Sequence, residues 1–304
     1  MKKCFFYIVL AGLFWGTSGI FAPLLSPYGF TALQMATVRG SVSFCCMAIY
    51  VLIKDRSLFS VRWRQLLLFF CNGVAVFMAA SMYYLAMIMT SVSTAVVLMY
   101  TAPIFVSIGS AVLFGERFSK MKLISVAVML MGCCLVSGII GGMKFDPLGI
   151  LVGILAGVAY AIYNLFTKQA MRLGYSPVST TMYAFLFMAL IGLCVSRPAG
   201  IVVGVMNEPW PTAPLLLSMG VCTCVLPFFL YTLSLKRLPA GTASALGIIE
   251  PMAAMVYSIV IFGERPDLLS YVGILLILLA TVALGLGERQ NDPEKMVEKS
   301  ESEA

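Results

Sequence analysis

Residues 94–116, TAVVLMYTAPIFVSIGSAVLFGE, align with residues 242–264, TASALGIIEPMAAMVYSIVIFGE, at an offset of 148 positions. Both segments are apolar, carry a proline near the middle and end in Phe-Gly-Glu. Extended without gaps to residues 83–117 and 231–265, the alignment contains 12 identical positions out of 35. Self-similarity at a fixed offset is the signature of an internal repeat. The chain is therefore predicted to contain two copies of one structural unit.

The composition is that of an integral membrane protein. Of 304 residues, 61% are hydrophobic and 11% charged, with a mean hydropathy of +0.99, whereas soluble domains carry about 25% charged residues. Ten apolar runs are long enough to cross a hydrocarbon core of roughly 30 Å as helices. We expect an all-α protein with ten transmembrane helices, at about 5–25, 31–53, 66–89, 93–114, 122–141, 148–170, 178–197, 213–235, 241–262 and 268–287.

The N-terminal run has some features of a signal peptide, because Lys2 and Lys3 precede an apolar segment. The repeat argues against that interpretation, since the same offset places Trp15 on Tyr163. We expect this run to be the first retained span.

Five spans per repeat is an odd number, so the two copies are predicted to enter the membrane from opposite sides. The expected organisation is a first repeat at 1–143, a second at 144–287 and a disordered cytoplasmic tail at 288–304. Inverted repeats are typical of secondary transporters, in which the solute site lies near the middle of the bilayer between the repeats.

Positive charge in the connecting segments predicts the orientation. With sides alternating, 16 basic residues fall on one side and three, Lys144, Arg197 and Arg265, on the other. We therefore expect the protein to lie in the cytoplasmic membrane, with both termini on the cytoplasmic side. The net charge of +7 is then a topology signal, and we expect no nucleic-acid partner. Lys168 is interpreted as a side chain that extends toward the membrane surface.

The sequence lacks the residues that several classes of enzyme and metal chemistry require. The chain has no histidine, and its nine cysteines show no metal-ligand spacing. It contains neither a phosphate-binding G-x-x-x-x-G-K-[ST] loop nor a convergent pair of carboxylates. We expect no enzyme activity, no catalytic residues, no metal and no cofactor.

Glu250 is the carboxylate that the sequence places near mid-membrane. It lies nine residues into its span, about 13–14 Å at 1.5 Å per residue, and its counterpart in the first repeat is Ala102. An ionised carboxylate at that depth costs several kcal/mol unless it is paired, hydrated or protonated. Binding of a solute ammonium group, proton coupling and a purely architectural role all remain open. Arg39, at a similar depth, is the candidate for a buried charge pair, although a structural cation is the alternative.

The two prolines of the repeated segment are predicted to interrupt their helices. Each removes one backbone hydrogen bond and frees the carbonyl four residues earlier, at Met99 for Pro103 and at Gly247 for Pro251. Such breaks are tolerated at membrane depth where they face protein or a wet cavity. We expect paired hinges or cavity-lining breaks, with a simple packing kink as the alternative.

The chain resembles a ten-span member of the drug/metabolite transporter superfamily with two EamA-type repeats. The residues that carry the resemblance are FWGTSG at 14–19, Arg39 and the two segments that end in Phe-Gly-Glu. The resemblance implies a carrier with a central cavity between its halves, often an exporter of amino acids or other small metabolites. This family commonly places a glutamate before the second proline, which is why an architectural role for Glu250 stays open.

We expect a secondary transporter that exports a small polar or amphipathic, amino-acid-like metabolite by alternating access. An importer or exchanger of a larger cofactor-like or nucleotide-like solute, or a non-transporting or flippase-type membrane component, remains the alternative. The expected partners are the solute and the lipid bilayer, with the chain a monomer or a weak homo-oligomer. The candidate cavity residues are Trp15, Asn72, Tyr83, Tyr100, Tyr163, Asn164, Glu250 and Tyr257, with Arg39 and Glu250 as the charge pair and Pro103 and Pro251 as hinges.

Overall fold

The computed structural model describes residues 2–90, 92–115, 120–136, 146–263 and 268–290. The Glu-Arg pairs at 116–117 and 264–265, Lys144, the predicted boundary at 143/144 and residues 291–304 of the tail lie outside this range. Within it every regular element is a helix, so the all-α prediction is confirmed for the described residues.

The first half contains helices α1 to α7. Their bounds are α1 Lys2–Gly16, α2 Ser18–Leu25, η1 Ser26–Tyr28, α3 Ala32–Lys54, η2 Arg56–Phe59, α4 Trp63–Met89, α5 Val92–Met99, α6 Ala102–Phe114 and α7 Lys120–Val136. The run expected at 5–25 forms two helices, because the Thr17 hydroxyl donates to the Phe14 carbonyl at 2.6 Å and the backbone bond from Thr17 N also goes to Phe14.

The second half contains helices α8 to α15. Their bounds are α8 Pro147–Arg172, α9 Pro177–Val195, α10 Pro198–Asn207, α11 Pro209–Gly220, the π-helical turn η4 Val221–Val225, α12 Leu226–Ser234, α13 Ala240–Leu246, α14 Ile249–Phe262 and α15 Leu268–Gln290. In the described part of the chain, seven helical stretches are long and apolar enough to cross a membrane, and three shorter apolar helices accompany them. The count of ten spans stays a prediction.

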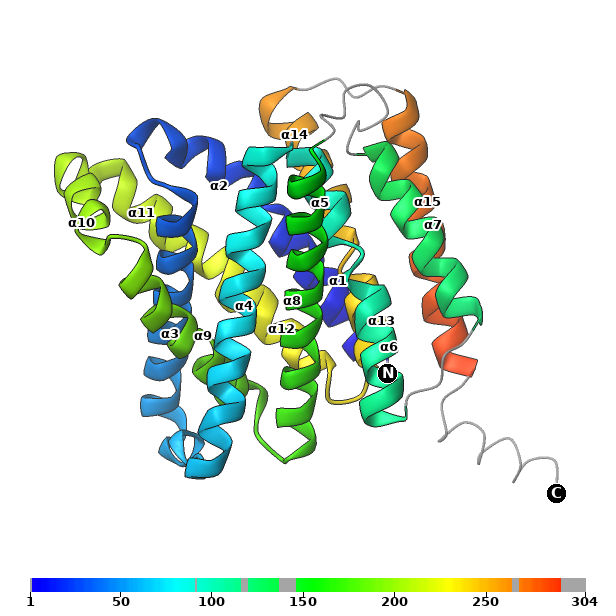
Figure 1. Ribbon diagram of the computed structural model, residues 1–304, viewed down its shortest axis with the longest axis horizontal. Coiled ribbons are helices and arrows are strands. Elements are labelled where there is room, and N and C mark those ends of the chain that lie inside the picture. The colour runs from blue at the N-terminus through cyan, green and yellow to red at the C-terminus, as the bar shows by residue number, and fades with distance from the viewer. Residues whose placement is uncertain (1, 91, 116–119, 137–145, 264–267, 291–304) are drawn as a thin grey trace.

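Helices from the two halves of the chain pack against each other. The most closely packed pairs are α4 with α8 and α9, α7 with α15, α3 with α9, and α1 with α12 and α14. In Figure 1, α7 and α15 lie side by side at one edge of the bundle, and α10 and α11 lie toward the opposite edge. Each of these main contacts joins an element before residue 137 to one after residue 146.

Both prolines of the repeated segment stand at helix interruptions. Helix α5 ends at Met99 and α6 begins at Ala102, while α13 ends at Leu246 and α14 begins at Ile249. Each proline therefore lies in the first turn of the second helix, where its missing N–H leaves no intrahelical bond unmade. The structure has both interruptions where the prolines predict them, whereas a hinge function stays a prediction.

Glycines hold these two interruptions close to neighbouring helices. A Cβ on Gly16 of α1 would lie 2.7 Å from Cβ of Ala253 on α14. A Cβ on Gly153 of α8 would lie 2.6 Å from a Leu98 methyl group on α5. Only a residue without a side chain fits at these distances, so α1 and α8 approach the interruptions at backbone contact.

Candidate functional site

The two helix interruptions meet at a small central cavity. It has a volume of about 10 Å³, which is room for roughly one water molecule. Its walls come from α1, α8 and both interrupted pairs, α5–α6 and α13–α14. The lining residues are Trp15, Met99, Tyr100, Ala102, Pro103, Tyr160, Ser244, Gly247 and Glu250.

A hydrogen bond joins the two interruptions across this cavity. The Tyr100 hydroxyl donates to Oε2 of Glu250 at 2.6 Å, a short distance that is typical of O–H···O⁻ bonds. Tyr100 is buried and Glu250 is partly buried. At the repeat offset, Tyr100 corresponds to Ile248 and Glu250 to Ala102. Each repeat thus supplies one polar partner at a position where the other repeat has an apolar residue.

Ser244 supplies a second polar group to the cavity. Its side chain is 3% exposed, and its Oγ has no hydrogen-bond partner among the described residues. A buried hydroxyl left unsatisfied costs about 1–3 kcal/mol. The Ser244 hydroxyl is therefore available to donate a hydrogen bond to, or accept one from, a molecule that enters the cavity.

Aromatic side chains form the remaining wall. Trp15 packs edge-on against Phe228, with ring centroids 5.1 Å apart, and also contacts Tyr231. Tyr160 stacks on Tyr163 at 5.9 Å. Of these rings, only Trp15 and Tyr160 line the cavity; the others support them from behind.

Five of the eight predicted cavity residues, Asn72, Tyr83, Tyr163, Asn164 and Tyr257, are not among those that line the cavity. Tyr163 is fully buried in the core, Asn72 donates to the Thr167 hydroxyl at 3.2 Å, and the Tyr257 hydroxyl donates to the Leu13 carbonyl at 3.1 Å. Tyr83 is partly buried on α4. The side chains of Asn72, Tyr163 and Tyr257 instead pack against neighbouring helices.

Asn164 lies one layer behind the cavity. It accepts a hydrogen bond from the Tyr231 hydroxyl and donates to the Tyr160 carbonyl at 2.7 Å. Its amide therefore connects α8 to α12 behind the two lining rings. A role for any of the predicted residues in solute binding stays a prediction.

Arg39 bonds to the π-helical turn. Its Nη2 donates to the Thr223 carbonyl at 3.0 Å, inside η4. π-Helical turns widen the backbone ladder and often accompany functional sites. The guanidinium thus ties α3 to the turn between α11 and α12, while the predicted charge pair with Glu250 stays a prediction.

Lys168 differs from its expected placement. Its side chain is only 9% exposed, and Nζ donates to the carbonyls of Leu235 at 2.7 Å and Leu238 at 2.8 Å. The interpretation of an amine extended toward the surface was wrong. The ammonium group instead satisfies backbone carbonyls at the end of α12, as cations often do at helix C-termini.

Sequence reasoning identified the positions of Met99 and Gly247 through their prolines but missed Ser244. A signal for Ser244 exists, because its counterpart at the repeat offset is Val96. The same comparison that singled out Glu250 against Ala102 also marks this serine.

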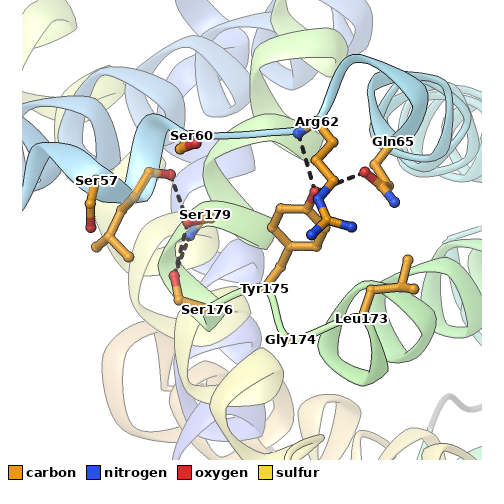
Figure 2. A pocket seen from close by; sticks show the side chains of 10 residues that line it. Ser57, Ser60, Arg62, Gln65, Leu173, Gly174, Tyr175, Ser176 and Ser179 are labelled. Atoms are coloured by element: carbon orange, nitrogen blue, oxygen red, sulfur yellow. Dashed lines mark hydrogen bonds between the residues drawn. The ribbon is translucent and has the colours of Figure 1, made fainter.

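A larger cavity, of about 360 Å³, lies at one end of the bundle (Figure 2). The cavity lies between the η2–α4 connection and the α8–α9 turn, and residues of both line it. The Tyr175 hydroxyl donates to Gln65 at 3.2 Å and accepts from the Arg62 backbone N–H at 3.4 Å. Ser179 donates to the Leu58 carbonyl at 2.8 Å. These bonds hold the two connections together.

The same connection contains Asp55, which caps η2 by accepting from Ser57 N at 2.9 Å. Hydrogen bonding from Ser57 lowers the pKa of this exposed carboxyl. Because the hydroxyls of Tyr175, Ser176 and Ser179 at the end cavity have hydrogen-bond partners within the protein, the central cavity, with a partly buried carboxylate and an unsatisfied hydroxyl, is the better candidate for a functional site.

Comparisons with known proteins point in one direction. The model of the EamA-like transporter family matches the chain twice, over residues 2–138 and 147–286. An uncharacterized transporter of Clostridium kluyveri is 26% identical over the full length of both chains. An uncharacterized transporter of Archaeoglobus fulgidus is 31% identical over 68% of this chain and 72% of its own.

Two further similarities concern an exporter and a fold. The threonine/homoserine exporter RhtA of Salmonella typhimurium is 26% identical over 91% of this chain and 88% of its own. A solved crystal structure aligns with a TM-score of 0.76 at 17% identity, over 96% of this chain and 99% of the other. At that identity the structural likeness shows the fold alone.

Proposed function

This chain belongs to the EamA-like transporter family, and on that premise we propose that it is a secondary transporter that works by alternating access. The family and the named relatives are transporters, and the chain is a multi-span membrane protein. We propose a small polar or amphipathic, amino-acid-like solute and the direction of export. The name of the threonine/homoserine exporter supports the solute class.

We further propose ten spans arranged as two inverted repeats of five, with the boundary between residues 143 and 144. The packing supports this arrangement. Helix α4 packs on α8, and the helices that correspond to them at the repeat offset, α12 and α1, also pack on each other. The same holds for α6 on α8 and its counterpart, α14 on α1. Two orientations of one scaffold can then open the centre to either side with similar energy.

The observation that carries the proposal is the Tyr100–Glu250 hydrogen bond between the two interrupted helices. In transporters, discontinuous helices place backbone groups and charged side chains at the midplane, where the solute binds. The central cavity is too small for any such solute. The structure therefore corresponds, in this proposal, to a closed state, and solute entry requires the two halves to separate.

If transport is coupled to protons, Glu250 is the carboxylate placed to carry them, because the sequence offers no other at this depth. We expect Glu250→Gln in proteoliposomes to abolish uptake driven by a pH gradient while solute exchange continues. A glutamine keeps the size and hydrogen-bonding shape of the side chain but cannot exchange a proton.

The measurement is counterflow of radiolabelled amino acids, nucleosides and sugars, followed by uptake with and without a pH gradient. Glu208→Gln, at an exposed glutamate, is the matched control and is expected to retain both activities. Normal pH-driven uptake by Glu250→Gln would assign Glu250 a structural role. Absence of flux for every solute in correctly inserted protein would refute the transporter proposal.

A further inference from the structure

We propose that the central cavity recognises an ammonium group, and that Tyr100 occupies on Glu250 the place which that group takes when the solute binds. This inference rests on the proposed transport function, and it names the chemical feature of the solute that the site selects. It also assigns Tyr100 a specificity-determining role.

The composition of the cavity wall favours a cation. Three aromatic side chains, Trp15, Tyr100 and Tyr160, surround one carboxylate, Glu250. Aromatic faces attract ammonium groups within about 6 Å of the ring, more strongly when the site is dry. In the described part of the chain, none of the nine lining residues is lysine or arginine. A nucleotide-like anion would meet a carboxylate and find no cation among these nine residues.

The size of the cavity forces an exchange. The Tyr100 hydroxyl lies 2.6 Å from Oε2 of Glu250, and an ammonium nitrogen would need to lie about 2.7–2.9 Å from the same carboxylate. With Tyr100 in place, the remaining volume of about 10 Å³ holds roughly one water-sized group and has no room for the carbon skeleton that the ammonium group of a solute carries. The tyrosine must move away when the ammonium arrives. Because Tyr100 and Glu250 belong to different interrupted helices, that movement also separates the two halves.

The rest of the site makes a weaker demand on the solute. Ser244 contributes one neutral hydroxyl, which can bond to a hydroxyl or to a carboxylate. Among the described residues that line the cavity, no cationic side chain requires the solute to carry a carboxylate. The inference therefore says more than that the solute is amino-acid-like. The solute must carry an ammonium group, whereas a carboxylate is not required.

Three groups interact with the Glu250 carboxylate. They are the Tyr100 hydroxyl beside it and the charge of Arg39 on α3, together with Tyr160 on α8, on which the Glu250 charge itself acts. All measurements are therefore made at one fixed pH near neutrality, so that titration of these groups does not enter the comparison.

A tryptophan that lines the cavity provides the readout. The chain has three tryptophans, and Trp63 and Trp210 are 77% and 81% exposed. With both changed to phenylalanine in the full-length protein, Trp15 remains as the fluorescent reporter. The probes are L-threonine, L-threoninol, which keeps the amine but lacks the carboxylate, and 2,3-dihydroxybutanoate, which keeps the carboxylate but lacks the amine.

We expect L-threonine and L-threoninol to change the Trp15 fluorescence and 2,3-dihydroxybutanoate to have no effect at about tenfold higher concentration, a margin equivalent to roughly 1.4 kcal/mol. The same three-way comparison with L-leucine, leucinol and 2-hydroxy-4-methylpentanoate covers a larger, apolar side chain. Binding of a hydroxy acid as tight as that of its amine counterpart, or no response to either amine series, would overturn the inference.

In Tyr100→Phe, the amine no longer competes with the hydroxyl, so we expect its Kd to fall about tenfold. In Glu250→Gln, we expect the preference for amines to disappear. The matched control is Tyr183→Phe. The Tyr183 hydroxyl donates to the Phe59 carbonyl at 2.8 Å and does not line the cavity, so the Kd values of this variant should equal those of the parent protein. An unchanged or higher amine Kd in Tyr100→Phe would contradict the exchange.

The wild-type comparison of analogues needs no substitution in the cavity, so the inference stays testable if Tyr100→Phe fails to fold. The outcome also differs from failure of the proposed function. A protein that carries hydroxy acids in counterflow as well as amines is still a transporter but does not select ammonium. A protein with no flux of any solute fails the transport proposal instead.

Discussion

At the scale of single residues, Lys168 offers a direct test of how the bundle is held together. Its buried ammonium group donates to the carbonyls of Leu235 and Leu238. We expect Lys168→Met to lower the free energy of unfolding by at least about 3 kcal/mol, since it removes two hydrogen bonds from a charged group, each worth roughly 1.5–3 kcal/mol, while methionine keeps much of the packing. Denaturant unfolding in detergent measures the change.

The control is Lys236→Met at an exposed lysine in the adjacent turn, where surface substitutions typically shift stability by less than about 0.5 kcal/mol. Equal losses in the two variants would contradict a specific role for Lys168.

What the sequence predicted about residues depended on whether the signal was local. Pro103 and Pro251 act on their own helices, so the interruptions followed from the sequence. Glu250 stood out because its repeat counterpart is alanine. The burial of Lys168 depends on carbonyls 67 and 70 residues away. The partner of Glu250 is likewise 150 residues distant, and no periodicity in the chain encodes such a contact.

At the scale of elements, the glycine face of α8 determines how close α5 approaches. Gly149, Gly153 and Gly157 face Thr90, Leu98 and Thr101 in turn. This glycine face of α8 therefore extends to the α5–α6 interruption. We expect Gly153→Leu to destabilise the protein by about 1–3 kcal/mol through overpacking and to reduce transport, because α5 must move outward.

The same unfolding and counterflow assays test this expectation. Leu151→Phe enlarges a side chain on the exposed face of the same helix and is expected to change neither quantity. Full activity and stability in Gly153→Leu would show that the close contact is not required.

The sequence predicted helices better than it predicted their continuity. Apolar composition defines a span by length, and seven helical stretches satisfy that criterion within the described residues. The run at 5–25 nevertheless breaks at Thr17, and the run at 213–235 contains the π-helical turn η4. Both irregularities leave hydropathy unchanged, since they arise from single side-chain and backbone bonds such as that from Arg39 to Thr223.

At the scale of the whole molecule, the charge distribution predicts which end faces the cytoplasm. We expect the thiol introduced by Ser57→Cys in η2 to react with a membrane-impermeant maleimide only after cells are permeabilised. Trp210→Cys, in the first turn of α11, should react on intact cells. Both positions are exposed, and the nine native cysteines are first replaced by alanine or serine. The reverse labelling pattern would invert the proposed topology.

The narrowness of the central cavity has an electrical consequence. A void with room for about one water molecule, enclosed by Trp15, Tyr160 and the two helix interruptions, holds no continuous chain of waters along which protons could hop. We therefore expect the proposed closed state to conduct no protons through this cavity. If solute separates Tyr100 from Glu250 as we propose, a cell could hold many copies of the protein in its membrane without discharging the proton gradient while solute is absent.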